Sequence, residues 1–142
     1  MRYLLDTDHL SVLQRQQGPA FVAVSARIAE HPVEDIVLSI VSFHEQVLGC
    51  HAYINRARDS ASTVRGYAML GQVIRDFSVA PVLPFDTSAA EVFAALIAQP
   101  RRVASMDLRI AAISLAHDCV LVTRNRRDFA LFPGLRVEDW TM

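Results

Sequence analysis

The chain has 142 residues, and its 14 basic side chains nearly balance 15 acidic ones, for a net charge of −1. Hydrophobic residues make up 52% of the chain and the mean hydropathy is +0.25, which excludes a disordered chain and predicts a single folded domain over residues 1–142. The balanced charge argues against a protein held on nucleic acid by bulk positive charge. Every basic residue is arginine, so mechanisms that need a catalytic lysine are excluded.

The cysteines and the N-terminal residues indicate the cellular compartment of the protein. Cys50 and Cys119 stand in apolar stretches without a CxxC spacing, which favours buried free thiols in a reducing compartment. Asp6 interrupts the first apolar run too early for a signal peptide. The longest apolar run, near residues 36–43, is shorter than the roughly 20 residues that a membrane helix needs. We therefore expect a soluble protein of the cytoplasm with no membrane segment.

The first half of the chain alternates predicted strands with predicted helices. A short buried strand at residues 2–5 precedes helices at about 9–17 and 19–31, which the Gly18-Pro19 pair separates. A second strand covers about residues 35–39. Two long amphipathic helices follow, at about 41–56 and 59–77.

The second half continues the alternation. A third strand at about residues 79–85 contains Pro81 and Pro84, which suit strand ends or edges. Helices are predicted at about 86–98 and 107–117, a strand at 119–123, and a short last strand at 135–138. Continuous apolar strands joined by helices are typical of a parallel sheet covered on both faces. We therefore predict an α/β fold, a three-layer α/β/α sandwich around a central, mainly parallel sheet of four to five strands.

Acidic residues stand near the expected carboxyl-end edge of the predicted sheet, where open parallel sheets place their binding sites. These residues are Asp6 and Asp8 after the first strand, Glu45 after the second, Asp107 before the fourth and Asp128 after the fourth. Converging carboxylates repel one another, and a hard divalent cation such as Mg²⁺ or Mn²⁺ removes that repulsion through oxygen ligands. Such an ion can polarise a phosphoryl oxygen and lower the pKa of a bound water. The pattern indicates metal-assisted hydrolysis of phosphodiester bonds.

Helix capping is the competing interpretation of each acid taken singly. An acid at the start of a helix commonly accepts a hydrogen bond from the first backbone N–H groups. The residues that fit a cap or a capping box are Asp6, Asp8, Asp86, Ser42 with Glu45, Ser105 or Asp107, and Asn125 with Asp128. Only their joint arrangement favours a metal site.

Four segments together carry a family resemblance that spans nearly the whole chain. They are Tyr3-Leu-Leu-Asp6-Thr7-Asp8-His9-Leu-Ser11, Ser39-Ile-Val-Ser-Phe-His-Glu45, Ser105-Met-Asp107-Leu-Arg-Ile110, and Leu121-Val-Thr123-Arg-Asn125-Arg-Arg-Asp128-Phe129, with Pro133-Gly-Leu135 and Trp140 in the tail. These segments resemble the motifs of the PIN-domain family and, within it, the VapC-type toxins of type II toxin–antitoxin pairs. The resemblance implies a PIN-like fold.

The resemblance also implies a Mg²⁺- or Mn²⁺-dependent endoribonuclease. Asp6 and Asp107 would be the primary metal ligands, and Glu45 and Asp128 would complete the cluster or position the attacking water. Thr7 and Thr123 are candidates to support these ligands. Hydrolysis by metal-activated water would leave a 5′-phosphate and a 3′-hydroxyl.

The chain departs from the family pattern at Asn125, where many relatives carry aspartate. An amide can bind a metal through its oxygen but brings no charge, so either Asp128 or Asn125 could fill the fourth role. Arginines cluster in sequence around Asp107 and Asp128, and arginine suits bidentate phosphate contacts. The expected substrate contacts are Arg124, Arg126 and Arg127; Arg101, Arg102 and Arg109 belong to the same sequence cluster.

The expected partners follow from the same resemblance. They are a structured RNA of the tRNA or rRNA class, read mainly in single-stranded loops, and a VapB-type antitoxin whose tail inserts at the acidic cleft, with a homodimer as the expected assembly. Two alternatives stay open. Asp6 and Asp8 also resemble the DxD loop of haloacid-dehalogenase-type phosphatases, although these normally use a lysine; a catalytically degenerate PIN fold that only binds a partner is the other.

Overall fold

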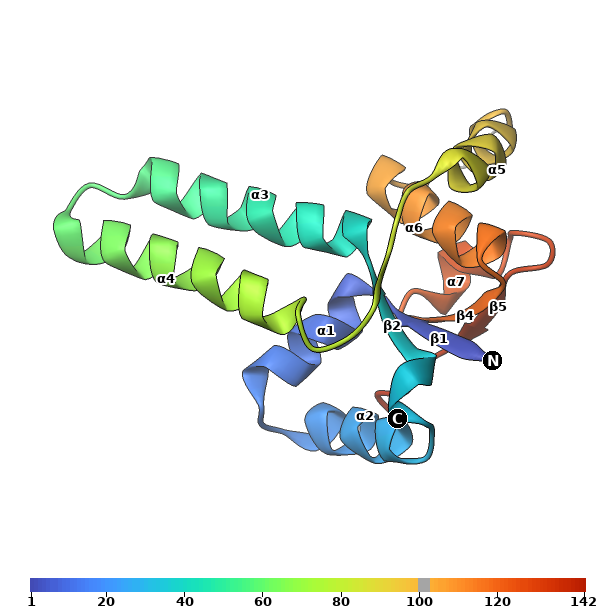
Figure 1. Ribbon diagram of the computed structural model, residues 1–142, viewed down its shortest axis with the longest axis horizontal. Coiled ribbons are helices and arrows are strands. Elements are labelled where there is room, and N and C mark those ends of the chain that lie inside the picture. Colours follow the sequence, from blue (N-terminus) through green and yellow to red (C-terminus); the bar gives the residue numbers. More distant parts are fainter. Residues whose placement is uncertain (100–102) are drawn as a thin grey trace.

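The computed structural model describes residues 1–99 and 103–142. Five parallel strands form one sheet in the order β3-β2-β1-β4-β5, and helices cover both of its faces (Figure 1). The strands are β1 (Arg2–Leu5), β2 (Ile36–Ser39), β3 (Val82–Leu83), β4 (Cys119–Val122) and β5 (Arg136–Glu138). The helices are α1 (Thr7–Arg15), α2 (Pro19–Ala29), α3 (Ile40–Arg56), α4 (Ser60–Asp76), α5 (Thr87–Ile97), α6 (Ser105–Ala116) and α7 (Arg126–Phe129), with a 3₁₀ turn at Val33–Asp35. The predicted α/β sandwich with four to five strands is confirmed.

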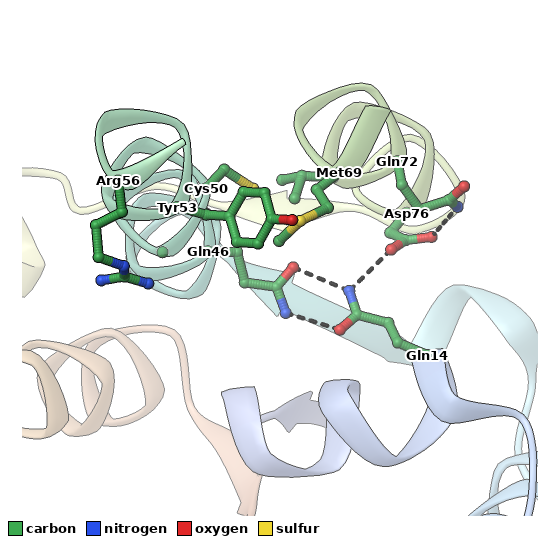
Figure 2. A pocket seen from close by; sticks show the side chains of 10 residues that line it. Gln14, Gln46, Cys50, Tyr53, Arg56, Met69, Gln72 and Asp76 are labelled. Atoms are coloured by element: carbon green, nitrogen blue, oxygen red, sulfur yellow. Dashed lines mark hydrogen bonds between the residues drawn. The ribbon is translucent and has the colours of Figure 1, made fainter. Parts of the chain in front are cut away.

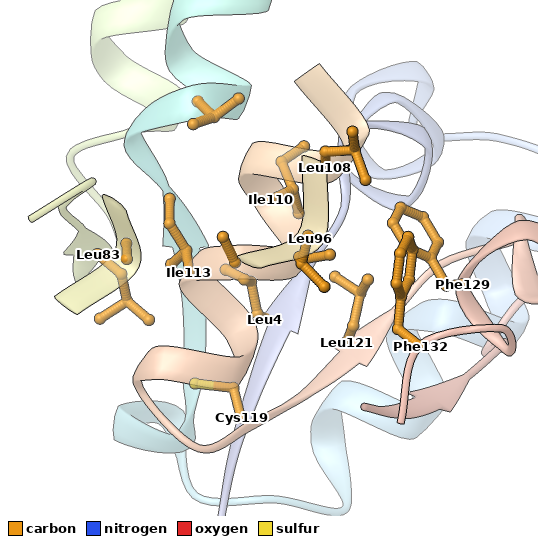
Figure 3. Close-up of a cluster of buried hydrophobic side chains, with 14 of the residues drawn as sticks. Leu4, Leu83, Leu96, Leu108, Ile110, Ile113, Cys119, Leu121, Phe129 and Phe132 are labelled. Atoms are coloured by element: carbon orange, nitrogen blue, oxygen red, sulfur yellow. The ribbon is translucent and has the colours of Figure 1, made fainter. Parts of the chain in front are cut away.

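Alternate side chains of each strand enter two different cores, because successive residues of a strand point to opposite faces. Leu4 and Leu121 pack with α5 and α6 on one face, where Ile110 and Ile113 of α6 lie over the sheet (Figure 3). Their neighbours Leu5 and Val122 belong instead to the second cluster, with residues of α1, α2, α3 and α4. Both faces are therefore apolar, which explains why the strands read as continuous hydrophobic runs.

Helices α3 and α4 form an antiparallel pair that projects from the sheet (Figure 1). Each begins at a capping side chain: Ser39 Oγ accepts from the backbone N–H of Ser42 at 3.0 Å, and Asp59 Oδ1 from that of Ser62 at 2.7 Å. Near the end of the pair the helices touch at Gly66, where an added Cβ would lie 2.5 Å from Ile54 Cγ1. The absence of a side chain at Gly66 thus sets how closely α3 and α4 approach.

The bounds of several predicted elements differ from the observed ones. The predicted strand at 79–85 contracts to β3, Val82–Leu83, because Pro81 and Pro84 bracket it and have no N–H to donate to a ladder. Helix α6 begins at Ser105, two residues earlier than predicted, and α1 begins at Thr7 rather than at His9. In the described part of the chain no helix is both long enough and apolar enough to cross a membrane.

Candidate metal centre and active site

The strand order brings the carboxyl ends of β1 and β4 together. In the sheet, β2 and β3 lie on one side of β1, and the chain then crosses over to form β4 on the other side. The space beyond the carboxyl ends of β1 and β4 is therefore a topological switch point, which is the usual binding site of open α/β sheets. Asp6 directly follows β1 and Thr123 directly follows β4. The Thr123 hydroxyl donates to Asp6 Oδ2 at 2.7 Å, so side chains 117 residues apart meet there.

Asp6 is a buried carboxylate at the centre of this region. Its Oδ1 accepts the backbone N–H of Thr7 at 2.8 Å, so it does cap α1, as the capping interpretation expects. Burial, and then the negative charges of Asp8 and Asp107, raise the pKa of Asp6 to about 7, against the lowering effect of hydrogen bonds from Thr123 and Thr7. A nearby cation would offset the cost of this buried charge.

Glu45 approaches the same region from α3. Thr7 Oγ1 lies 3.1 Å from Glu45 Oε1 and 2.9 Å from Ser42 Oγ, and it connects α1 to α3. Burial and the negative charge of Asp107 raise the pKa of Glu45, although the Thr7 hydrogen bond acts against them. The predicted Ser42–Glu45 capping box is wrong: the cap is Ser39, which leaves Glu45 in the second turn of α3 with its carboxylate free of any capping role.

Asp107 comes from the first turn of α6. Ala104 stands at the cap position of this helix, so neither Ser105 nor Asp107 caps it, contrary to the capping interpretation. Burial raises the pKa of Asp107, and the negative charges of Asp128 and Asp8 add to that effect. Because Asp107 in turn raises the pKa of Asp6 and Glu45, these carboxylates from distant segments share one electrostatic environment.

Asp128 reaches this environment from α7, beside the uncharged Asn125. The Asn125 side-chain amide donates to Asp128 Oδ2 at 3.1 Å, so Asn125 holds Asp128 in place. Asn125 stands at the cap position of α7, but its side chain caps no backbone N–H there. Asp86 is the contrasting case, since Asp86 Oδ1 accepts from the N–H of Ala89 at 3.0 Å and is the helix cap that the sequence predicts.

The arginines that cluster in sequence around Asp107 and Asp128 differ in their surroundings in the structure. Arg124, Arg126 and Arg127 are exposed on the turn after β4 and on α7, the helix that carries Asp128. Arg109 instead lies over the ring of Phe93, with its guanidinium carbon 5.6 Å from the ring centroid, so it packs against α5. Arg101 and Arg102 lie outside the described residues.

Asp8 has a role that the sequence interpretation missed. It does not cap α1, because the helix already begins at Thr7. Asp8 Oδ2 accepts the backbone N–H of Arg124 at 3.0 Å, and Asp8 Oδ1 lies 2.7 Å from His9 Nδ1. Although burial alone would raise the pKa of Asp8, these hydrogen bonds together lower it. In the sequence, the only sign of a role for Asp8 at the site is its position two residues after Asp6.

The donor set suits a hard divalent cation. Among residues 1–99 and 103–142, no three His, Cys, Asp or Glu side chains form a ready-made metal cage. Mg²⁺ does not need one, because it keeps several waters and binds proteins through one or two carboxylates. Burial is the main cause that raises the pKa values of Asp6, Asp107 and Glu45, and neighbouring negative charge adds to it; a bound cation would offset both effects. The residues present therefore fit Mg²⁺ or Mn²⁺.

A groove of about 470 Å³ lies away from these carboxylates, between α1 and the α3–α4 pair (Figure 2). Gln14 of α1 and Gln46 of α3 exchange two side-chain hydrogen bonds of 2.9 and 3.0 Å, and Gln14 also donates to Asp76 of α4 at 2.8 Å. Tyr53 and Met69 supply its apolar surface. None of these residues stands out in the sequence, because glutamines and isolated apolar side chains carry no motif.

Comparisons with known proteins agree with this architecture. The PIN domain family model matches residues 3–135. The tRNA(fMet)-specific endonuclease VapC of Shigella flexneri is 38% identical over 64 residues, and that of Salmonella typhimurium is 38% identical over 63. Each alignment covers 42% of this chain and 48% of the relative, so the match spans about half the length of these proteins.

Solved structures share the whole fold. VapBC-1 from nontypeable Haemophilus influenzae aligns with a TM-score of 0.79 at 21% identity, over 100% of both chains. FitAcB from Neisseria gonorrhoeae aligns with a TM-score of 0.72 at 25% identity, over 96% of both. The five-stranded parallel sheet, the acidic switch point and the family match define the class of protein. The chain belongs to the PIN domain family.

Proposed function

We propose that this chain is a Mg²⁺- or Mn²⁺-dependent endoribonuclease and the toxin of a VapBC-type pair, acting in the cytoplasm. The observation that carries the proposal is the convergence of Asp6, Glu45, Asp107 and Asp128 on one electrostatic environment at the switch point of the sheet. The two curated relatives are named as tRNA endonucleases, which supports RNA of the tRNA class as substrate. Membership of the PIN family leaves the phosphatase hypothesis without support.

Asp6 and Asp107 would hold the ion, with Glu45 and Asp128 completing the negative cluster. When bound, a divalent ion lowers the pKa of a water and stabilises the negative charge that develops on a phosphoryl group. Thr123 and Thr7 keep the Asp6 carboxylate oriented through their hydrogen bonds, and Glu45 would accept a proton from the attacking water. The exposed Arg124, Arg126 and Arg127 would bind the RNA phosphates. The products would carry a 5′-phosphate and a 3′-hydroxyl.

The test is RNA cleavage by the purified chain, freed of any partner. Cleavage of total tRNA should require Mg²⁺ or Mn²⁺, stop with chelator, and fall by about 100-fold or more in Asp107→Asn, because a metal ion contributes several kcal/mol to such reactions. Asp118→Asn is the matched control: it removes a carboxylate whose side chain is 88% exposed and pairs with Arg136 outside the site, and it should keep full activity. Equal activity of Asp107→Asn and the wild type would refute the metal assignment. A chain that cleaves no RNA under any of these conditions would instead support the non-catalytic binding module.

We also propose that the α3–α4 pair binds a VapB-type antitoxin. Tyr67, Met69 and Ile74 of α4 and Leu48 of α3 are large apolar side chains exposed on this pair, and exposed apolar surface is typical of protein interaction sites. The groove of Figure 2 opens on the same pair. One solved structure with this fold is described as a toxin–antitoxin complex from Klebsiella pneumoniae, and another, from Mycobacterium tuberculosis, as a member of the VapBC family of toxin–antitoxin systems.

We expect a small antitoxin to be encoded beside this chain, and co-expression of the two proteins tests the partner. The two should co-purify, and Tyr67→Ser with Ile74→Ser should weaken the complex without unfolding the chain, since both side chains are largely exposed. The mass measured by light scattering also tests the expected homodimer. Failure of the neighbouring protein to bind would overturn the toxin assignment and leave the nuclease assignment standing.

A further inference from the structure

His9 is a fully buried histidine that the proposed chemistry does not use. Its Nε2 lies 3.0 Å from the backbone nitrogen of Trp140. A backbone N–H can only donate, so Nε2 must be the acceptor and the ring proton must sit on Nδ1. Nδ1 lies 2.7 Å from Asp8 Oδ1 and therefore donates to it. Asp139 Oδ1, 3.6 Å from Nε2, is already engaged by the backbone N–H and hydroxyl of Thr141.

Asp8 continues this chain of hydrogen bonds to the turn after β4. Its Oδ2 accepts from the backbone N–H of Arg124 at 3.0 Å, across 116 residues of sequence, and lies 3.2 Å from Thr123 Oγ1. Thr123 donates its proton to the nearer carboxylate, Asp6 Oδ2, at 2.7 Å, and its oxygen accepts the backbone N–H of Asn125 at 3.1 Å. One connected series thus links the C-terminal segment to Asp6.

This arrangement gives Asp8 a different task from the other acids. Both of its oxygens are engaged by protein donors, so Asp8 is satisfied without a cation. We propose that His9 and Asp8 are positioning residues: His9 orients the Asp8 carboxylate, which holds the Thr123–Asn125 turn so that Thr123 reaches Asp6 and Asn125 presents Asp128. The hydrogen-bond series stands on its own geometry, while its effect on catalysis rests on the proposed function.

The donor pattern makes the substitution Asp8→Asn a sharp probe. An amide has one oxygen and one NH₂ group. With its oxygen toward Arg124, the introduced amide would turn its NH₂ against the Nδ1–H of His9. His9 cannot relieve this contact between two donors by moving its proton to Nε2, because the backbone N–H of Trp140 already donates to Nε2. The mismatch should disappear when the residue at position 9 has no donor.

The experiment is a double-mutant cycle of Asp8→Asn and His9→Phe in the full chain, with Asp118→Asn as matched control. The first readout is hydrogen exchange of the Arg124 amide in metal-free protein. Asp8→Asn should speed this exchange about tenfold or more, as expected for loss of a hydrogen bond to a charged group, and less so in the His9→Phe background. Additive effects, or an Arg124 amide that exchanges as in the wild type, would overturn the proposal.

The second readout is binding of Mn²⁺ by calorimetry, together with kcat and KM for RNA. Asp8→Asn should weaken Mn²⁺ binding and lower kcat, because Thr123 and Asn125 lose their support. His9→Phe should also weaken Mn²⁺ binding and lower kcat. His9→Gln should keep much of the Mn²⁺ binding and kcat that His9→Phe loses, since a carboxamide offers a donor and an acceptor as the neutral ring does. Equal losses in His9→Gln and His9→Phe at equal stability would show that His9 only fills space.

The two sets of measurements separate the two proposals. If the wild type neither binds Mn²⁺ nor cleaves RNA, the proposed function fails, while the exchange data on metal-free protein still decide the hydrogen-bond series. If His9→Phe does not fold, the comparison of Asp8→Asn with His9→Gln decides it. In that case an unchanged Arg124 exchange rate in Asp8→Asn overturns the proposal.

Discussion

Asp6 combines burial with proximity to other carboxylates. The structure leaves only 6% of this residue exposed, and its pKa rises from 3.8 to about 7, first through burial and then through the charge of Asp8. Between these two values the folded protein keeps a proton that the unfolded chain has released. The free energy of unfolding of the metal-free protein should therefore fall as the pH rises from about 4 to about 7 and stay low above that range.

Asp6→Asn removes this pH dependence. In chelator, the variant should gain stability over the wild type as the pH increases from about 5 to about 8, by up to about 1.4 kcal/mol for each pH unit of the shift. Urea unfolding at both pH values measures the gain, and Asp118→Asn should show none. The same stability difference between Asp6→Asn and the wild type at both pH values would contradict the burial of a charged Asp6.

Thr123 offers a second test at this scale. It is fully buried and donates to Asp6 Oδ2. Thr123→Val keeps the shape but leaves that oxygen without its donor, so kcat/KM for RNA should fall by about tenfold or more. Thr123→Ser keeps the hydroxyl and should retain most of the activity. Similar losses in the two variants would assign Thr123 a packing role only.

At the scale of elements, the α3–α4 pair is determined by small and capping residues as much as by apolar ones. Gly66 and Gly71 both lie within α4, yet their surroundings differ. A Cβ at Gly66 would meet Ile54 Cγ1 at 2.5 Å and Tyr53 Cδ1 at 3.1 Å, whereas one at Gly71 would meet only the flexible end of Arg75 at 3.6 Å. The same substitution should therefore act in opposite directions at the two positions.

Gly66→Ala should destabilise the protein by about 1 kcal/mol or more, because the two helices must move apart. Gly71→Ala should stabilise it by up to about 1 kcal/mol, because alanine favours a helix over glycine. Thermal unfolding of both variants measures the difference, and antitoxin binding by Gly66→Ala reports whether the spacing of the pair matters to the partner. A stabilising Gly66→Ala would show that α3 and α4 do not approach as described.

For the whole molecule, the proposed metal site would couple metal binding to folding, because its acids come from the residue after β1 and from α3, α6 and α7. The site exists only when all these segments are in place, so an ion bound there stabilises the folded state alone. At a Mn²⁺ concentration about 100 times the dissociation constant, the gain of about 2.7 kcal/mol should raise Tm by roughly 5 to 10 °C for a domain of this size.

The increase in Tm should vanish in Asp6→Asn and in Asp107→Asn and persist in Asp118→Asn. Differential scanning fluorimetry at a series of Mn²⁺ concentrations provides the measurement. An increase that survives both site variants would place the bound ion elsewhere in the molecule.

Much of the fold could be predicted from the sequence because its signals are local. The apolar period distinguishes strands from helices, and residues such as Pro81 and Asp86 act on their immediate neighbours. The order of the strands and of helices α1 to α6 therefore emerged correctly, whereas the short α7 was not predicted. Continuous apolar strands indicated a sheet covered on both faces. The same local signals left the strand ends imprecise, as in β3, where two prolines cut a seven-residue prediction to Val82–Leu83.

The acidic residues show where local information ends. A helix cap and a metal ligand both require a carboxylate near a helix start, so the sequence alone could not separate Asp86, which is a cap, from Glu45, which is not. The family resemblance favoured the metal-ligand interpretation but did not show where these residues lie in the folded chain. Asp8 shows the same limit, because its partner Arg124 lies 116 residues away.

The sequence by itself determined the class of fold, the alternation of elements and the set of acids that could form a site. Only the tertiary structure decided which strands are neighbours, and with that which carboxylates share an environment and which are satisfied by the protein. The physical reason is the range of the forces. Propensity, capping and apolar periodicity act within a few residues, whereas the pKa of Asp6 and the hydrogen bonds of Asp8 depend on segments that meet only after the sheet has assembled.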